Sequence, residues 1–155
     1  MERVTPVRGS CFCGAVRFEF VVPTLFCGHC RCSLCRRAHG ADDVTWIRVK
    51  IQPVLLTAGP DHLAAFSLLD QGKRLFCGQC GSSLLCESYT HPDVIGTSLA
   101  NLQESIDRDP RAHYYFSDRV DWTAVGDELP RFGGETGTEP LAPQTPSHFG
   151  TEKHA

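Results

Sequence analysis

Hydrophobic and polar residues alternate in short runs along most of this chain. The segments 15–22 and 44–51 show the alternation, are rich in β-branched and aromatic residues, and are each followed closely by a proline, so both are predicted strands. The segment 33–39, ending at Gly40, favours one short helical turn, and no stretch of helix length has a 3.6-residue apolar period. Further short strands are predicted at 25–29, 63–68, 74–76, 83–87, 94–99 and 113–117. The chain is therefore predicted to be mainly β.

The composition changes near residue 133. From there the sequence is rich in glycine, threonine and proline and poor in large apolar side chains. A segment of this kind cannot bury enough surface to offset the loss of conformational entropy on ordering. We therefore expect one folded domain at 1–132 and a flexible C-terminal tail at 133–155, with Leu129 and Phe132 as the last packing anchors.

Length and charge narrow the possible functions. The 155 residues suit a single domain, and the formal net charge of −3 without a polybasic block argues against nucleic acid or an anionic membrane as the main partner. No stretch approaches the ~18 apolar residues of a membrane span, and the first residues carry no apolar run typical of a signal peptide. We expect a cytoplasmic protein, and the sequence leaves its oligomeric state open.

The cysteines carry most of the functional information. The chain has nine, an odd number that fits a paired disulfide framework poorly, and without secretion clustered cysteines favour metal binding. Seven of them lie in three tight groups: Cys11 and Cys13; Cys30, Cys32 and Cys35; Cys77 and Cys80.

Two of these groups combine into a predicted four-sulfur zinc site. Cys11, Cys13, Cys77 and Cys80 form two close pairs that are far apart in sequence, the arrangement typical of tetrahedral structural zinc. Structural zinc contributes an apparent ~10–16 kcal/mol in small metal-folded peptides. Because the net stability of a whole domain is only ~5–15 kcal/mol, we expect this domain to depend on its metal.

Cys30, Cys32 and Cys35 remain as a separate group with three possible roles. Three thiolates can hold a zinc ion whose fourth position is open to substrate. Alternatively, Cys27, His29, His39 or Cys86 closes the site as a fourth ligand and makes it structural. In the third reading, the group is a reactive or redox thiol cluster without a tightly held metal.

Residues close to the triplet have roles that the sequence alone leaves open. Arg36 and Arg37 follow it directly, and they either hold a substrate carboxylate and lower nearby thiol pKa values or form a solvated basic turn. Cys86 lies in a predicted strand, where a small buried hydrophobic residue is the simpler interpretation. His29 and His39 flank the triplet and are candidate proton donors.

Taken together, the cysteine segments resemble those of a known family. The segments 9–18 (GSCFCGAVRF), 30–40 (CRCSLCRRAHG) and 76–84 (FCGQCGSSL) resemble its three zinc motifs, and 113–122 with 128–132 resemble its closing segment. The order and spacing match over 9–132. The family is that of the glutathione-dependent formaldehyde-activating enzymes, which includes the centromere protein V-like proteins.

This resemblance implies a fold, two zinc sites and an activity. The fold is a β-tent, built of small antiparallel sheets pinned by zinc. The implied cofactors are two zinc ions per chain, a structural one on the four-cysteine set and a catalytic one on the triplet. The implied activity is that of a carbon–sulfur lyase, which joins glutathione to formaldehyde as S-hydroxymethylglutathione. The chain departs from the family pattern in two ways. Arg31 stands where a histidine is common, which bears on substrate preference. Cys27 and Cys86 are additional cysteines, which bear on whether the second zinc has an open position.

The chemistry of a three-cysteine zinc suits this reaction. A free thiol has a pKa of ~8.5 and is mostly protonated at neutral pH, whereas a thiol that binds zinc is deprotonated and becomes a nucleophile for an aldehyde. The expected partners are therefore a small thiol, glutathione, and a small aldehyde. The alternative function is a non-catalytic thiol carrier or interaction module with two structural zincs, since glutathione and formaldehyde also react rapidly without an enzyme.

Overall fold

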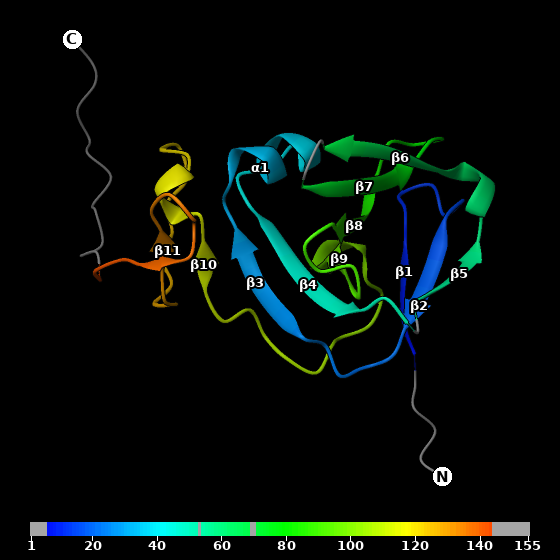
Figure 1. Cartoon of the computed structure of the whole chain (residues 1–155), viewed down its shortest axis with the longest axis horizontal. Coiled ribbons are helices and arrows are strands. Elements are labelled where there is room, and N and C mark those ends of the chain that lie inside the picture. The colour runs from blue at the N-terminus through cyan, green and yellow to red at the C-terminus, as the bar shows by residue number, and fades with distance from the viewer. Residues whose placement is uncertain (1–5, 53, 69–70, 144–155) are drawn as a thin grey trace.

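The computed structural model describes residues 6–52, 54–68 and 71–143, and short strands dominate them (Figure 1). Seven strands form the main sheet in the order β10-β3-β4-β9-β8-β7-β6. All neighbours in this sheet are antiparallel except β10 and β3, which pair in parallel. In chain order these strands are β3 Phe26–Cys30, β4 Val44–Lys50, β6 Leu63–Leu68, β7 Gly72–Cys77, β8 Ser83–Ser88, β9 Val94–Ser98 and β10 His113–Tyr114.

A three-stranded antiparallel sheet packs against one face of the main sheet. It consists of β1 Val7–Ser10, β2 Arg17–Phe20 and β5 Leu55–Ala58, in the order β1-β2-β5. Its buried Phe18 and Phe20 join Ile47 of β4 and Leu84 of β8 in the hydrophobic core. Gly9 lies directly under the Phe18 ring, where an added Cβ would come within 2.2 Å of the ring atom Cζ, so the close approach of β1 requires glycine.

The two faces of the main sheet differ in character because side chains alternate along each strand. On β4, Ile47 and Val49 are buried in the core, whereas Trp46 and Arg48 lie on the opposite face. The short helix α1, Ser33–His39, contacts β4 and buries Cys35. The sheet therefore has a core face and a second face that borders the cysteine triplet.

The ends of α1 explain why it is only seven residues long. Cys32 is extended at φ −63°, ψ 151°, and its side chain accepts a hydrogen bond from the Cys35 N–H as an N-cap. Gly40 adopts the left-handed conformation at φ 61° and its N–H bonds to the Arg36 carbonyl, which ends the helix as predicted. The three 3-10 turns are η1 Pro60–His62, η2 Leu99–Asn101 and η3 Phe116–Asp118.

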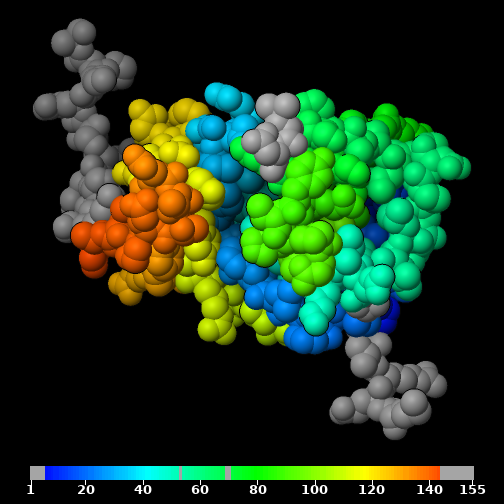
Figure 2. Space-filling view, in the orientation of Figure 1, coloured from blue at the N-terminus to red at the C-terminus, as the bar shows by residue number. Residues whose placement is uncertain are grey.

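The folded part of the chain continues beyond residue 132, where the sequence analysis placed the domain boundary. Strands β11 Phe132–Gly133 and β12 Glu139–Pro140 form a small hairpin, and the Tyr115 N–H donates to the Gly137 carbonyl at 2.9 Å. Figure 2 shows this C-terminal segment in orange, packed against the yellow segment that precedes it. Regular structure therefore extends beyond the expected boundary at 132, because the two strands pair and Phe132 stacks on Tyr114. The rest of the expected tail, 144–155, lies outside the described residues.

The predicted class, mainly β with small antiparallel sheets, is confirmed. Each predicted strand corresponds to an observed one, but the strand predicted at 113–117 ends at Tyr114 and is followed by the turn η3. The helical turn at 33–39 is confirmed. The strands β1 and β5 were not predicted. No helix in the described ranges has the length and apolar character needed to cross a membrane.

Candidate metal centres

Two turns bring the four predicted ligands of the first site together. Cys11 and Cys13 lie in the turn between β1 and β2, and Cys77 and Cys80 lie at the end of β7 and in the turn that leads to β8. The ligand atoms of all four lie within 4.8 Å of one another. The Sγ atoms of Cys11 and Cys13 are 3.6 Å apart, and those of Cys13 and Cys77 are 3.9 Å apart.

These separations fit one tetrahedral metal ion. Zinc–sulfur bonds of ~2.3 Å in tetrahedral geometry place the sulfurs ~3.8 Å apart. Cys77 is fully buried and Cys11 is 3% exposed, so the cluster is anchored in the core of the domain. The group can hold a metal ion, and its all-thiolate composition suits zinc.

Hydrogen bonds fix both ligand turns in place. The Gly14 N–H donates to the Cys11 carbonyl at 3.1 Å, and the Gly81 N–H donates to the Cys77 carbonyl at 2.8 Å. Both glycines have positive φ, 75° and 78°, which explains their place beside the ligand pairs. Ser82 links the turns, because its hydroxyl oxygen accepts from the N–H of Phe12 in the other turn.

The second group joins a strand end to the start of α1. Cys30 ends β3, Cys32 caps α1, and Cys35 lies in the first turn of that helix. Their three sulfurs lie within 4.8 Å of one another. The second group can therefore also hold a metal ion.

None of the proposed fourth ligands joins the triplet. In the described ranges, no other cysteine, histidine or carboxylate has a ligand atom within 4.8 Å of all three sulfurs. Cys27 belongs to the hydrophobic core, and the Nδ1 of His29 lies 2.9 Å from the Thr45 hydroxyl oxygen. Cys86 is half-buried and lies outside the hydrophobic core, and burial raises the pKa of its thiol as it does that of Cys27.

The Cys35 sulfur accepts two N–H donors from neighbouring strands. Trp46 Nε1 of β4 donates to it at 3.4 Å, and an Nη of Arg74 on β7 donates to it at 3.5 Å. Hydrogen bonds lower the pKa of Cys35 to about 2. Those from the two other thiols of the triplet contribute most, and those from Arg74 and Trp46 contribute less. The two N–H donors therefore favour the thiolate form of Cys35.

Arg31 lies between two ligands of the triplet but takes part in a separate buried network. Its Nε donates to His113 Nδ1 at 3.2 Å, and its guanidinium pairs with Asp43 at 3.2 Å. His113, 1% exposed, stacks on the His29 ring and contacts Asp127 through Nε2 at 2.9 Å. Because Nδ1 accepts a hydrogen bond, His113 is neutral and donates to Asp127. Burial lowers the pKa of His113, which favours this neutral form.

His39, at the end of α1, lies against the Trp46 ring. The two rings meet edge to face with centroids 5.3 Å apart. The buried Nε2 of His39 has no hydrogen-bond partner within the described part of the chain. Burial lowers the pKa of His39, so the ring is neutral near pH 7.

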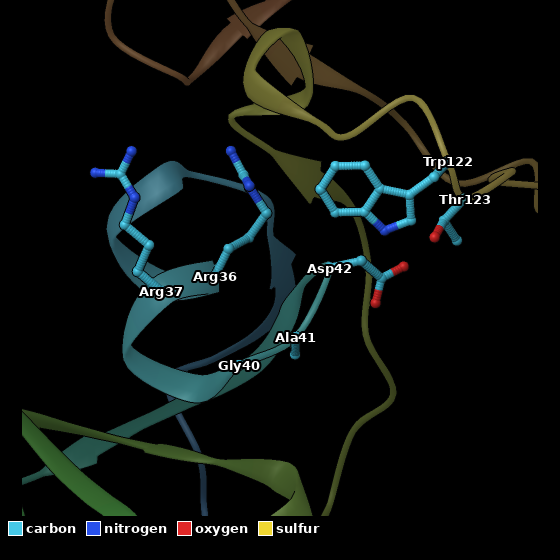
Figure 3. A pocket seen from close by; sticks show the side chains of 7 residues that line it. All are labelled: Arg36, Arg37, Gly40, Ala41, Asp42, Trp122 and Thr123. Carbon is cyan, nitrogen blue, oxygen red and sulfur yellow. The ribbon is translucent and has the colours of Figure 1, made fainter.

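The arginines after the triplet line an open pocket of about 500 Å³ (Figure 3). Arg36 is engaged with the backbone, donating to the carbonyls of Arg31 and Asp118 at 3.2 Å each. Arg37 is exposed. Trp122, which is 70% exposed, stands across the pocket from the two arginines. The pocket is lined by Arg36, Arg37, Gly40, Ala41, Asp42, Trp122 and Thr123.

Sequence reasoning located the cysteines but missed the side chains that surround them. The sequence places Trp46 within one predicted strand and Arg74 and His113 at the starts of two others, with no further role. Their roles depend on which strands become neighbours, and no local spacing in the sequence carries that information.

Comparisons with known proteins agree on one family. Residues 6–118 match the sequence profile of the family described as glutathione-dependent formaldehyde-activating enzyme. A curated protein of Halomonas elongata, named as a candidate glutathione-dependent formaldehyde-activating enzyme, is 28% identical over 126 residues, which cover 77% of this chain and 80% of that protein. A crystal structure of a Rhodobacter sphaeroides protein is similar with a TM-score of 0.53 and 27% identity, over 66% of this chain and 93% of that one.

Proposed function

This chain belongs to the glutathione-dependent formaldehyde-activating enzyme family, and from that premise we propose that it is a carbon–sulfur lyase that joins glutathione to formaldehyde. One observation carries the proposal. Cys30, Cys32 and Cys35 gather three sulfurs without a fourth protein ligand atom within reach in the described ranges. Such a site leaves a coordination position for a substrate thiol, which distinguishes catalytic from structural metal sites.

We assign zinc to both cysteine groups, two ions per chain. Cys11, Cys13, Cys77 and Cys80 would hold the structural ion, and Cys30, Cys32 and Cys35 the catalytic one. When bound to the triplet, zinc would supply a Lewis acid that stabilises the deprotonated form of a thiol ligand.

The chain's own residues hold the site and receive the substrate. Trp46 and Arg74 fix the position of the Cys35 sulfur through their N–H donors. Exposed Arg37 is free to pair with a glutathione carboxylate in the pocket beside Trp122, whereas Arg36 supports the loop after Cys30. Of the two candidate proton donors we prefer His39, because its Nε2 has no hydrogen-bond partner in the described ranges, whereas Thr45 already engages His29.

The test is the rate of S-hydroxymethylglutathione formation, followed by stopped-flow from glutathione and formaldehyde. The protein as purified should exceed the spontaneous rate. Cys32→Ser, which lacks one ligand of the triplet, should return to the spontaneous rate while its circular dichroism spectrum stays unchanged. A wild-type rate equal to the spontaneous rate would overturn the lyase assignment.

The alternative function is a non-catalytic thiol carrier or interaction module. It predicts either glutathione binding at the triplet without any rate increase, or two closed metal sites that ignore glutathione. Cytoplasmic location and small-molecule rather than nucleic-acid partners are part of the same proposal. The net charge of −3 and the absence of a polybasic block support the choice of partners.

A further inference from the structure

Arg74 is a half-buried cation that pairs with no carboxylate in the described part of the chain. No acidic side chain in the described ranges lies within 4.0 Å of its guanidinium. Its hydrogen bond to a side chain goes instead to the Cys35 sulfur, at 3.5 Å. A partly desolvated charge of this kind is costly unless an anion compensates it.

The neighbours of Arg74 hold it in this position. Its guanidinium carbon lies 5.9 Å from the centroid of the Trp46 ring, and Trp46 donates to the same sulfur. Across the ladder, Arg74 pairs with Cys86 of β8, so both side chains project from the same face of the sheet. The strand pairing and the indole together direct the cation to the triplet.

In the described ranges, no cationic side chain donates to the sulfurs of the four-cysteine group. Those sulfurs receive a hydrogen bond from the Val16 N–H and lie beside the Ser82 hydroxyl, both neutral groups. Burial does not separate the two groups, because Cys11 and Cys77 are 3% and 0% exposed and Cys35 is 7% exposed. The groups differ instead in the charged donor, which in the described ranges reaches only the triplet.

From this contrast we infer that Arg74 is the positioning residue that allows the Cys30, Cys32 and Cys35 site to accept a second anion, the thiolate of its substrate. The inference rests on the proposed function of that site. A divalent ion with three thiolate ligands has a net charge of −1, and a fourth thiolate changes the net charge to −2. Arg74 offsets that added charge where little water can do so.

This role makes a specific prediction about which thiols are affected. Because Arg74 acts on the sulfur, its loss should weaken the binding of a neutral thiol such as 2-mercaptoethanol by the same factor as the binding of glutathione. An arginine that binds a glutathione carboxylate, as proposed for Arg37, would affect glutathione alone. Comparing the two thiols therefore separates the two roles.

The experiment is calorimetric titration of both thiols into the metal-loaded protein over a series of pH values. Arg74→Met and Arg74→Gln both remove the charge, and glutamine keeps an N–H donor. Thiol binding is compared with the wild type for whichever variant retains two metals and the wild-type circular dichroism spectrum. Arg74→Lys tests rescue by charge. Arg48→Met is the matched control, because Arg48 lies on the same face of the sheet and stacks on Phe26 at 5.3 Å.

We expect the charge-removing variants to bind both thiols at least about ten-fold more weakly, and their binding to require a pH higher by roughly one unit. Arg74→Lys should recover part of the affinity, and Arg48→Met should match the wild type. The inference is overturned if wild-type protein binds both thiols and the charge-removing variants bind them equally well, or lose affinity for glutathione only. Loss of the second metal from both variants would also overturn it, since Arg74 would then be needed for the site itself. If wild-type protein binds neither thiol, the proposed function fails instead.

Discussion

Arg36 and Arg37 are adjacent in sequence but differ in their surroundings. The Arg36 guanidinium donates to two backbone carbonyls, whereas Arg37 is exposed at the pocket. We predict that Arg36→Ala lowers the free energy of unfolding by about 1–2 kcal/mol, the usual worth of such hydrogen bonds. Arg37→Ala should leave stability unchanged and weaken glutathione binding without affecting 2-mercaptoethanol. Thermal melts and thiol titrations of both variants check this, and a reversal of the two effects would contradict it.

His113 should make stability depend on pH. Burial lowers its pKa in the folded protein, so below its ordinary value of ~6.5 the unfolded chain binds more protons than the folded one. The contribution of this histidine is therefore complete above pH ~6.5 and is lost as the pH falls below it. Denaturant unfolding at pH 7.5 and 5.5, with metal content checked at both, should show a larger drop for wild type than for His113→Gln. Equal drops would show that other groups cause the pH dependence.

At the residue scale, the sequence predicts ligands better than their surroundings. The spacing of Cys30, Cys32 and Cys35 is local, so it survives in the sequence without knowledge of the fold. Trp46 and Arg74 meet the Cys35 sulfur only because β4 and β7 lie in one sheet that borders α1. Contacts between residues distant in sequence leave no periodic signal.

At the scale of elements, the missed strands are short, and their ordering depends on pairing. Strands β1 and β5 have four residues each, too few to show a clear alternation. The hairpin of β11 and β12 has two residues in each strand and a composition typical of disordered segments. Composition alone therefore placed the domain boundary too early.

The hairpin leads to a truncation experiment. Ending the chain after residue 143 should leave the melting temperature unchanged, whereas ending it after 133 should lower stability by about 1–3 kcal/mol. The second truncation removes β12 and the Gly137 carbonyl to which the Tyr115 N–H donates. Thermal melts of the two truncated proteins decide the matter. Equal melting temperatures would instead support the domain boundary at 132 that the sequence predicts.

At the scale of the whole molecule, the two cysteine groups differ in what they connect. Cys11 and Cys13 come from one edge of the three-stranded sheet, and Cys77 and Cys80 from the main sheet, so a metal there joins the two layers. The triplet is contained in the six residues from Cys30 to Cys35. The same type of ligand thus has a global structural role in one group and a local role in the other.

Substitutions in the two groups should therefore have different consequences. Cys77→Ser should unfold the domain, because structural zinc contributes as much as the whole net stability of a typical domain. Cys32→Ser should remain folded with one metal instead of two. Circular dichroism together with elemental analysis distinguishes these outcomes, and similar damage in both variants would refute the division into structural and catalytic sites.

The central claim is that the Cys30, Cys32 and Cys35 site has an open position that takes the thiol of glutathione. Visible absorption of the cobalt-substituted protein tests this most directly, because the number of thiolate ligands changes the cobalt spectrum. Glutathione should shift the spectrum of one of the two cobalt ions toward that of the four-thiolate site, and S-methylglutathione, which cannot form a thiolate, should not. A spectrum that glutathione leaves unchanged, at concentrations well above those of the cobalt sites, would contradict the account.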